Sequence, residues 1–572
     1  MRSIASPTRP CGRVPRPHAN ERGIVLVAAL LFVMLASVLV LTLMTTTTGE
    51  RTQSSNTQTA RLALYAADAG VRSQQQLLAN LAKAKIDSCL AGWQAAGSNP
   101  AQPIIGNPAQ LFPAGTLGAA YAASSTNPSF AANATITFST SSVGPTSQTF
   151  DYMFTIQSNG ALSATGKRNV QSTGSLRVSA SRGSFSDFLL LTDQFKTANN
   201  VTTYFTTSDL FDGRVHTNDP IGFKFAFNPT FQDRVTQVGA NATYYNNGGS
   251  PVVVDANNNG AIDMPNFYGG YLRGQAAIPL PTNANDQQMV SLGQAVNNGT
   301  APTSAQINQA TTGNSATPPT NGGYLVNDGV NVTGGIYIQG TANRVKMFAD
   351  TVTDRQYFQI SVGAAHKSIE IDRAANQTRV WDKLGIGGPA DHVYTGVPNG
   401  VVYASSGIDN LTGPDRNALT GAVDPALAIN QRTLIASGGD IVIQGDLTCD
   451  QYDSNTNVLG IFSGGGAVRI GNGAPSNLNV DAFVMACGNT TGEFRVDGYN
   501  SGAYRGAMNL RGGVVSKFYG AFYTADANGN PITGFSRSFH YDRRGLIPPM
   551  YPSTGVFQSD IPTARTIAWK EI

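Results

Sequence analysis

The chain has 572 residues, of which 13% are charged and 41% are hydrophobic, and it contains 62 glycines and 29 prolines. Charged residues make up about 25% of an average soluble domain, so this chain has few charges and many turns. Its apolar share is too high for a disordered protein. The net charge is +3, and residues 1–23 hold five arginines against Glu21. The remainder is close to neutral, which excludes a nucleic-acid-binding protein.

An uncharged run of 21 residues, Ile24 to Met44, follows the basic leader. As a helix it spans about 31 Å, the thickness of a bilayer core, and it is longer than the ~7–15 residues of a signal peptide. The positive-inside rule places residues 1–23 in the cytoplasm and the chain after Met44 on the far side. The pattern predicts a single-pass protein of the inner membrane.

The helix is expected to continue well beyond the membrane. No proline lies between Pro17 and Pro100, which predicts one helix over residues 24–86. Its second half is amphipathic, with an apolar stripe that Gln74 interrupts. The stripe consists of Leu64, Ala67, Val71, Leu78 and Leu81. We expect one globular domain to cover it.

The junction Glu21-Arg22-Gly23-Ile24 and the segment Ala60–Gly70 resemble type IV pilin precursors, in particular the N-terminal region of PilX-like minor pilins and pseudopilins. The resemblance implies cleavage by a prepilin peptidase after Gly23, with Ile24 as the mature N-terminus. Major pilins carry a glutamate at the fifth mature position, where this chain has Ala28. The departure argues against a bulk filament subunit.

The resemblance therefore implies a type IV pilus or pseudopilus assembly component with a structural or adhesive role at the bacterial envelope. Other pilin or pseudopilin subunits would be its partners, on the periplasmic or extracellular side or in a surface filament. The alternative is a membrane-anchored β-solenoid enzyme or carbohydrate-binding protein whose helix is only an anchor.

Residues 87–184 are predicted to form loops and a small antiparallel sheet on the helix. Residues 100–147 are rich in small and polar residues and are expected to be loops, while Gln148–Gln157 and Asn169–Ser179 alternate as strands do. Residues 185–572 resemble an uncharacterised envelope domain that often follows PilX-like N-termini. Within it we expect a loop excursion near residues 281–322, with a short helix over Asp286–Val296, and a polar network around His216.

Short apolar strands recur beside glycines towards the C-terminus. Taking Ile443, Ile470 and Val496 as equivalent gives spacings of 27 and 26 residues, a plausible coil length for a β-solenoid. The predicted fold class is therefore α+β, with a long N-terminal helix and a large β-rich, solenoid-like ectodomain. A β-sandwich is the alternative. The tail from Ser536 to Pro549 is expected to cap a sheet edge.

Catalytic signatures are missing from the sequence: it has no G-x-S-x-G elbow, Walker A loop, H-E-x-x-H or C-x-x-C. We therefore expect a protein that binds and does not catalyse. Once the leader is removed, three cysteines are left, so one disulfide at most can form, and Cys449 with Cys487 is the pair that a solenoid would allow.

One loop has the spacing of a calcium site. Asp255, Asn257, Asn259 and Asp263 place oxygen ligands around Gly260, as in the D-x-N-x-N-G-x-I-D opening of calcium loops. The twelfth position is Asn266 where a glutamate is usual. We expect an Asn/Gly-rich turn here and no cofactor, with a calcium site as the alternative that the spacing allows.

Overall fold

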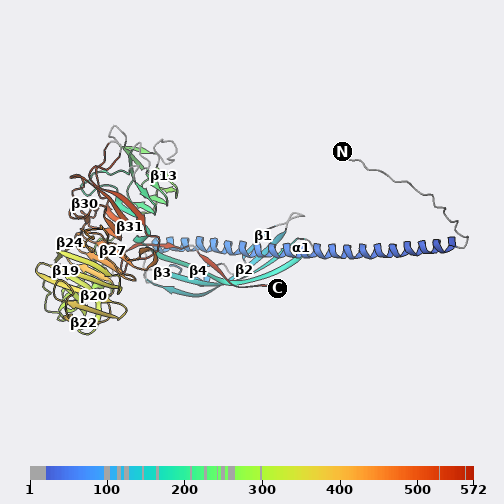
Figure 1. Cartoon of the computed structure of the whole chain (residues 1–572), viewed down its shortest axis with the longest axis horizontal. Helices are drawn as coiled ribbons and strands as arrows, with labels where there is room; N and C mark the ends of the chain where they lie inside the picture. The colour runs from blue at the N-terminus through green and yellow to red at the C-terminus, as the bar shows by residue number, and fades with distance from the viewer. Residues whose placement is uncertain are drawn as a thin grey trace, which may run out of the picture. The chain divides into compact units, whose positions relative to one another are not determined.

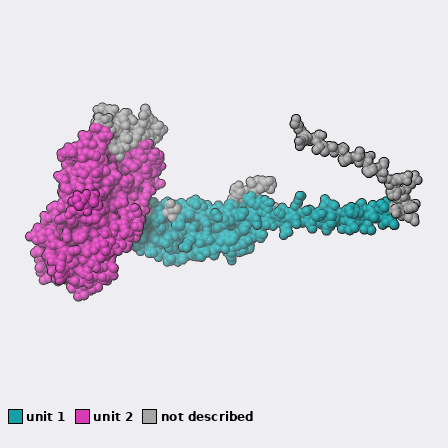
Figure 2. Space-filling model, viewed as in Figure 1, with its two compact units in different colours: residues 1–181, 558–572 teal, residues 182–557 magenta. Residues whose placement is uncertain are grey.

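The computed structural model describes residues 21–95, 103–112, 117–121, 128–144, 147–162, 166–205, 209–224, 229–240, 242–245, 251–254, 265–296, 299–526, 529–560 and 562–572. The chain forms two compact units. Unit 1 comprises residues 1–181 and 558–572, and unit 2 comprises residues 182–557 (Figure 2). Unit 2 is thus inserted between the last strands of unit 1, and the long helix is followed by a large β-rich region, as predicted.

Unit 1 is built on helix α1, which runs without interruption from Glu21 to Ala95. It extends past the predicted end at residue 86. A sheet in the order β1-β2-β3-β4, with β34 also paired to β4, packs along its second half (Figure 1). The strands are β1 Leu117–Tyr121, β2 Ser129–Val143, β3 Ser147–Ala161, β4 Lys167–Ser184, β33 Ser553–Ser559 and β34 Thr563–Glu571.

The antiparallel pairing of β3 with β4 agrees with the predicted sheet. Strands β1 and β2 differ from the prediction that residues 100–147 are loops. The inward positions of β2 include Ala132 and Ala134, which are buried, whereas its outward positions are mostly serine, threonine and alanine. Small residues on both faces weaken the apolar alternation on which a strand prediction depends.

In unit 2 the chain passes back and forth between two sheets, from β23 to β31. Strands β23, β25, β27, β29 and β31 pair in parallel in one sheet, and β24, β26, β28 and β30 pair in parallel in the other. The strands of the first sheet are β5 Leu190–Gln194, β7 Val215–Thr217, β10 Val235–Gln237, β14 Tyr271–Leu272, β15 Gly322–Asn327, β16 Val332–Gln339, β23 Val401–Ala404, β25 Arg432–Ser437, β27 Val458–Ser463, β29 Asn479–Ala486, β31 Tyr504–Phe518 and β32 Gly534–Tyr541. Those of the second are β17 Thr341–Ala342, β18 Arg344–Asp350, β19 Arg355–Val362, β20 Ala365–Asp372, β21 Gln377–Trp381, β22 His392–Thr395, β24 Gly407–Thr412, β26 Ile441–Ile443, β28 Val468–Ile470 and β30 Phe494–Val496.

The equivalence of Ile443, Ile470 and Val496 is confirmed, because these residues pair directly across β26, β28 and β30. Opposite them, Ile461 pairs with Ile435 and Val484 in the first sheet. All of these side chains belong to one buried core between the two sheets. Residues one repeat apart thus stack strand on strand within this core.

Two short helices cover the outer face of the first sheet. They are α2 Asn285–Ser291 and α3 Ser304–Thr312, so the expected excursion near 281–322 is partly helical. Ala284 and Leu292 at the ends of α2 pack with Phe462 and Met485 in a second core. Cover on both faces explains why every residue of β27 is buried.

The remaining elements are short. Two three-stranded sheets contain β6 Leu210–Phe211, β9 Thr230–Phe231 and β13 Asn266–Phe267, and β8 Gly222–Lys224, β11 Ala242–Tyr245 and β12 Pro251–Val254. In the described part of the chain, three 3-10 helices cover Pro108–Gln110, Phe185–Asp187 and Tyr452–Ser454. Strand β32 pairs with the first half of β31, on the side away from β29, so the tail from Ser536 does cover part of a sheet edge.

Candidate functional site

The first half of α1 carries an exposed apolar surface. Gly23 and Ile24 lie near the start of the helix, and Ala28 and Met44 lie within its apolar run. Ile24 is 73% exposed and Met44 is 64% exposed. The most apolar window of the helix has a mean hydropathy of 3.2 and is not buried at all. By length and composition this helix can cross a membrane, and it fits a single-pass anchor.

Beyond Met44 the exposed helix becomes polar. The threonine hydroxyls bond to carbonyls one turn earlier, for example Thr47 Oγ1 to Leu43 O at 2.7 Å and Thr52 Oγ1 to Thr48 O at 2.7 Å. Such bonds satisfy the hydroxyls without any neighbouring chain. The segment from Thr45 to Gln58 therefore stays helical although all of its residues are exposed.

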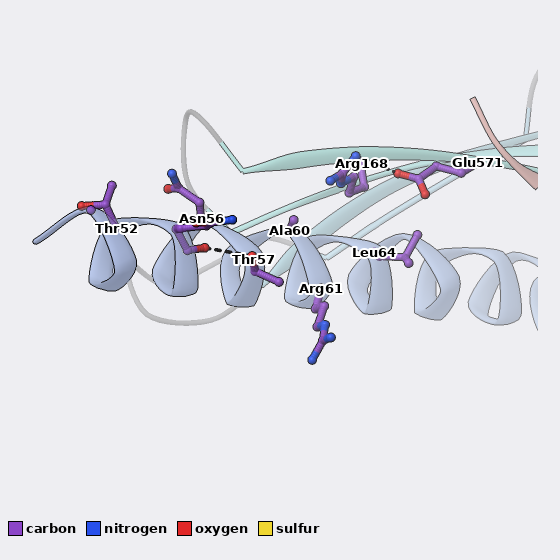
Figure 3. A pocket seen from close by; sticks show the side chains of 10 residues that line it. Thr52, Asn56, Thr57, Ala60, Arg61, Leu64, Arg168 and Glu571 are labelled. Atoms are coloured by element: carbon purple, nitrogen blue, oxygen red, sulfur yellow. Dashed lines mark hydrogen bonds and ion pairs between the residues drawn. The ribbon is translucent and has the colours of Figure 1, made fainter. Parts of the chain in front are cut away.

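An open groove of about 770 Å³ lies where α1 meets the end of the sheet (Figure 3). Arg168 of β4 and Glu571 of β34 form an ion pair of 3.0 Å on one wall, and Leu64 lines the helix side. Arg61 points away from this pair in Figure 3. The ion pair links β34 to β4, and the described residues that line the groove include no nucleophile–base pair.

The second half of α1 is docked on its own sheet through a stripe of small and apolar residues. Val71 and Leu78 are buried, as predicted, whereas Leu64 is half-buried. The stripe consists of Ala63, Ala67, Gly70, Val71, Gln74, Leu78, Ala82, Ile86, Leu90 and Trp93. Its spacing of three and four residues keeps one face of the helix on the sheet.

Gln74 does not interrupt this stripe, contrary to the expectation from its polarity. Its side chain is fully buried, and Nε2 donates to the carbonyl oxygen of Leu117 in β1 at 2.8 Å. The amide thus joins the helix to the edge of the sheet. Sequence periodicity marks the position as inward-facing, but the partner on β1 is visible only in the fold.

His216 lies in the predicted polar network of unit 2. Its Nε2 is 3.0 Å from Asn218 Oδ1, and its Nδ1 is 2.8 Å from Thr236 Oγ1 on the neighbouring strand. Burial lowers the pKa of the imidazole below its ordinary value. With both ring nitrogens engaged, His216 is a structural residue.

A hydrogen-bonded line that the sequence did not predict lies on the surface of unit 2. His540 Nδ1 is 3.1 Å from Asp212 Oδ2, and its Nε2 is 3.4 Å from Ser538 Oγ. Asp212 is 328 positions before His540. No local motif could have revealed the pair. The residue types, and the order in which they contact one another, are those of a nucleophile, its base and an orienting acid. The distance from Ser538 Oγ to His540 Nε2, however, is longer than the hydrogen-bond distance of about 3.2 Å that is usual between a nucleophile and its base.

The predicted calcium loop cannot be placed: Asp255, Asn257, Asn259 and Asp263 lie outside the described residues. Within the described ranges no group of three or more histidine, cysteine or carboxylate side chains is placed to hold a metal ion. Cys449 and Cys487, the two cysteines that a disulfide could have joined, are both free and buried. Burial raises the pKa of both thiols.

Comparison with known families agrees with the helix just described. Residues 22–72 match the PilX N-terminal family. The match covers the apolar half of α1 and the start of its docked half, including Gly23, Ile24, Ala28 and Met44. This PilX N-terminal segment relates the chain to type IV pili. It ends at residue 72, so all of unit 2 lies outside it.

Residues 149–240 match a domain of unknown function, DUF4900. This match runs from β3 and β4 of unit 1 into the first strands of unit 2. No curated protein and no solved structure matches the chain. The PilX N-terminal segment is therefore the part whose relatives carry a functional description.

Proposed function

We propose that this protein is a minor pilin-like component of type IV pilus or pseudopilus assembly, with a structural and adhesive role at the bacterial envelope. The observation that carries the proposal is the division of α1. Its apolar run from Ile24 to Met44 is exposed, and one face of its C-terminal half is buried against a sheet within the same unbroken helix. A helix of this kind can hold a subunit in the bilayer and later exchange lipid contact for contact with other helices.

The proposal includes the topology. The basic leader stays in the cytoplasm, the segment from Ile24 to Met44 crosses the inner membrane, and both units are exported. A prepilin peptidase cuts between Gly23 and Ile24. Removing the leader frees the helix to leave the membrane, because moving its arginines through hydrocarbon is costly.

Other pilin or pseudopilin subunits are the proposed partners. Since Ala28 offers no carboxylate for the contact that the major pilins' glutamate makes, we propose a low copy number, at a tip or in an initiation complex. The role is one of binding, without catalysis. The alternative is an anchored β-solenoid enzyme or carbohydrate-binding protein. The N-terminus of the mature protein distinguishes this alternative from a minor pilin-like component.

N-terminal sequencing of membrane-extracted protein tests the proposal. Co-expression with a prepilin peptidase is expected to give a chain that starts at Ile24. Gly23→Leu is expected to block cleavage, whereas Gly23→Ala, which keeps a small residue, should retain most of it. An intact Met1 in peptidase-positive cells would support a plain anchor.

Quantitative mass spectrometry of sheared filaments tests the copy number. We expect the protein at a small fraction of the main subunit. Equal abundance would contradict the minor-component role, and complete absence together with an unprocessed leader would favour the anchored alternative.

A further inference from the structure

An aromatic groove lies on the antiparallel extension of the second sheet of unit 2. It has a volume of about 440 Å³ and is open to solvent. Phe348 of β18 and Gln359 of β19 line it together with Asp424 and the two prolines of the facing loop, Pro414 and Pro425. Strands β18 and β19 therefore supply one wall, and a segment more than fifty residues later supplies the other.

The ring of Phe348 is held flat at this site. It stacks on Tyr357 with ring centroids 4.8 Å apart and an angle of 5° between the planes. Tyr357 is buried and Phe348 is half-buried, so the outer ring is fixed by the inner one. A rigid, partly exposed aromatic face binds the C–H face of a flat ligand at little cost in conformational entropy.

Polar groups stand beside this ring without partners. Among the described residues, the side chains of Gln359 and Asp424 make no hydrogen bond within the chain, and both line the groove. Asp350, by contrast, is occupied by its own turn: it accepts from the backbone N–H of Val352 at 2.9 Å. The groove thus offers a free amide and a free carboxylate next to an aromatic face.

The charges around the groove select against anions. Lys346 lines the groove but is paired with Asp415 at 2.9 Å, and Asp350 is bonded within its own turn and lies near Arg355, so Asp424 is the lining carboxylate without such a partner among the described residues. The charged lining residues, Lys346, Asp350 and Asp424, sum to one negative charge, which disfavours a sulfate, phosphate or uronate. A hydrogen-bonding, uncharged ligand with one apolar face fits the lining.

We propose that this groove binds an uncharged hexopyranose unit of a glycan chain, with the sugar ring on Phe348 and its hydroxyls on Gln359 and Asp424. The volume lies within the range of about 300–1,000 Å³ that is usual for small-ligand sites. The inference rests on the adhesive role proposed above and gives it a ligand class. It uses residues of unit 2 only, so it is independent of leader processing.

The test uses the full-length chain in detergent and saturation-transfer NMR with three probes: maltotetraose, cellotetraose and the anionic tetragalacturonate. We expect transfer to at least one neutral tetrasaccharide and none to tetragalacturonate. Phe348→Ala is expected to weaken the binding about tenfold or more, because the ring contact is lost. Gln359→Ala combined with Asp424→Ala should weaken it as well, without touching the Phe348–Tyr357 stack.

Tyr268→Ala is the matched control, since Tyr268 is 76% exposed and lies outside the groove lining. It should leave binding unchanged. Thermal melting of each variant separates loss of binding from loss of fold. No transfer to either neutral tetrasaccharide, equal transfer to tetragalacturonate, or unchanged binding by both groove variants would overturn the proposal. Each of these results leaves cleavage after Gly23 as it was, so failure here is distinguishable from failure of the pilus-related function.

Discussion

Gly160 of β3 lies directly against the backbone of Ala63 in α1: a Cβ atom at position 160 would sit 2.0 Å from the Ala63 carbonyl oxygen. Gly70 of the helix faces the sheet as closely, because its Cβ would sit 2.2 Å from Ser158 Oγ. Small residues on both surfaces thus let the helix approach the sheet to backbone contact. The rigid connection between the membrane half of α1 and its sheet depends on this close approach.

Two glycines in α1 give opposite predictions for the same substitution. Gly70→Ala is expected to destabilise unit 1 by about 1–3 kcal/mol, since the methyl group has no room beside Ser158. Gly92→Ala is expected to stabilise it by about 1 kcal/mol, because no atom lies within 4 Å of that Cβ and alanine favours the helix. Thermal unfolding followed by circular dichroism measures both. Equal effects would contradict the close packing at Gly70.

A charge on the docked face should detach the helix. Val71 is 3% exposed, so Val71→Asp buries an unpaired carboxylate and should cost at least about 3 kcal/mol. Ser73→Asp adds the same charge on the exposed face and serves as the control. Limited proteolysis and melting should show a loosened helix only in the first variant. Indistinguishable digestion patterns would mean that the stripe does not hold α1.

His216 makes the stability of unit 2 depend on pH. Burial depresses its pKa in the folded state, whereas the unfolded chain protonates it near pH 6.5. The free energy of unfolding should therefore be highest above about pH 6.5. Below that pH it should fall by up to about 1.4 kcal/mol per pH unit, until the pH reaches the pKa of His216 in the folded state.

Urea unfolding at a series of pH values measures this dependence. His216→Gln should remove the fall between pH 6.5 and the folded pKa, and His392→Gln, at an exposed histidine, should retain it. A persistent slope in the first variant would assign the effect to other groups.

The hydrogen-bonded residues Ser538, His540 and Asp212 allow the proposal that the protein does not catalyse a reaction to be tested. The Ser538 hydroxyl is 3.4 Å from the imidazole and the His540 side chain is 51% exposed, so the serine should not be activated. We expect no labelling of Ser538 by a fluorophosphonate probe above the level of a heat-denatured sample. Labelling that His540→Ala abolishes would instead support the anchored enzyme.

The loop from Asp255 to Asp263 gives a prediction about calcium. Calcium should raise the melting temperature of the protein, since a ligand that binds only the folded state stabilises it by mass action. Asp255→Ala should abolish the increase, and Asp286→Ala, outside the loop, should preserve it. Identical melting curves with calcium and with chelator would show that the folded protein does not bind calcium.

Local patterns predicted the elements whose side chains repeat regularly. The buried positions Val71 and Leu78, the β3–β4 pair and the equivalence of Ile443 with Ile470 all follow from spacing along the chain, because a helix or a stacked coil repeats its apolar face at a fixed interval. Strand β2 and helix α3 were not predicted. Small or polar residues dominate both, so hydrophobic periodicity is too weak to mark them.

The membrane-crossing length, the leader with its Gly23–Ile24 junction and the continuity of the long helix can be read from the amino-acid order, since these features depend on residues that are adjacent in the chain. The pairing of β34 with β4, the contact of Glu571 with Arg168, and the groove that Phe348 and Asp424 share are visible in the folded chain alone. Those contacts join residues far apart in the chain, and no spacing rule encodes them. They exist because unpaired strand edges and apolar faces are buried wherever the folded chain brings a partner.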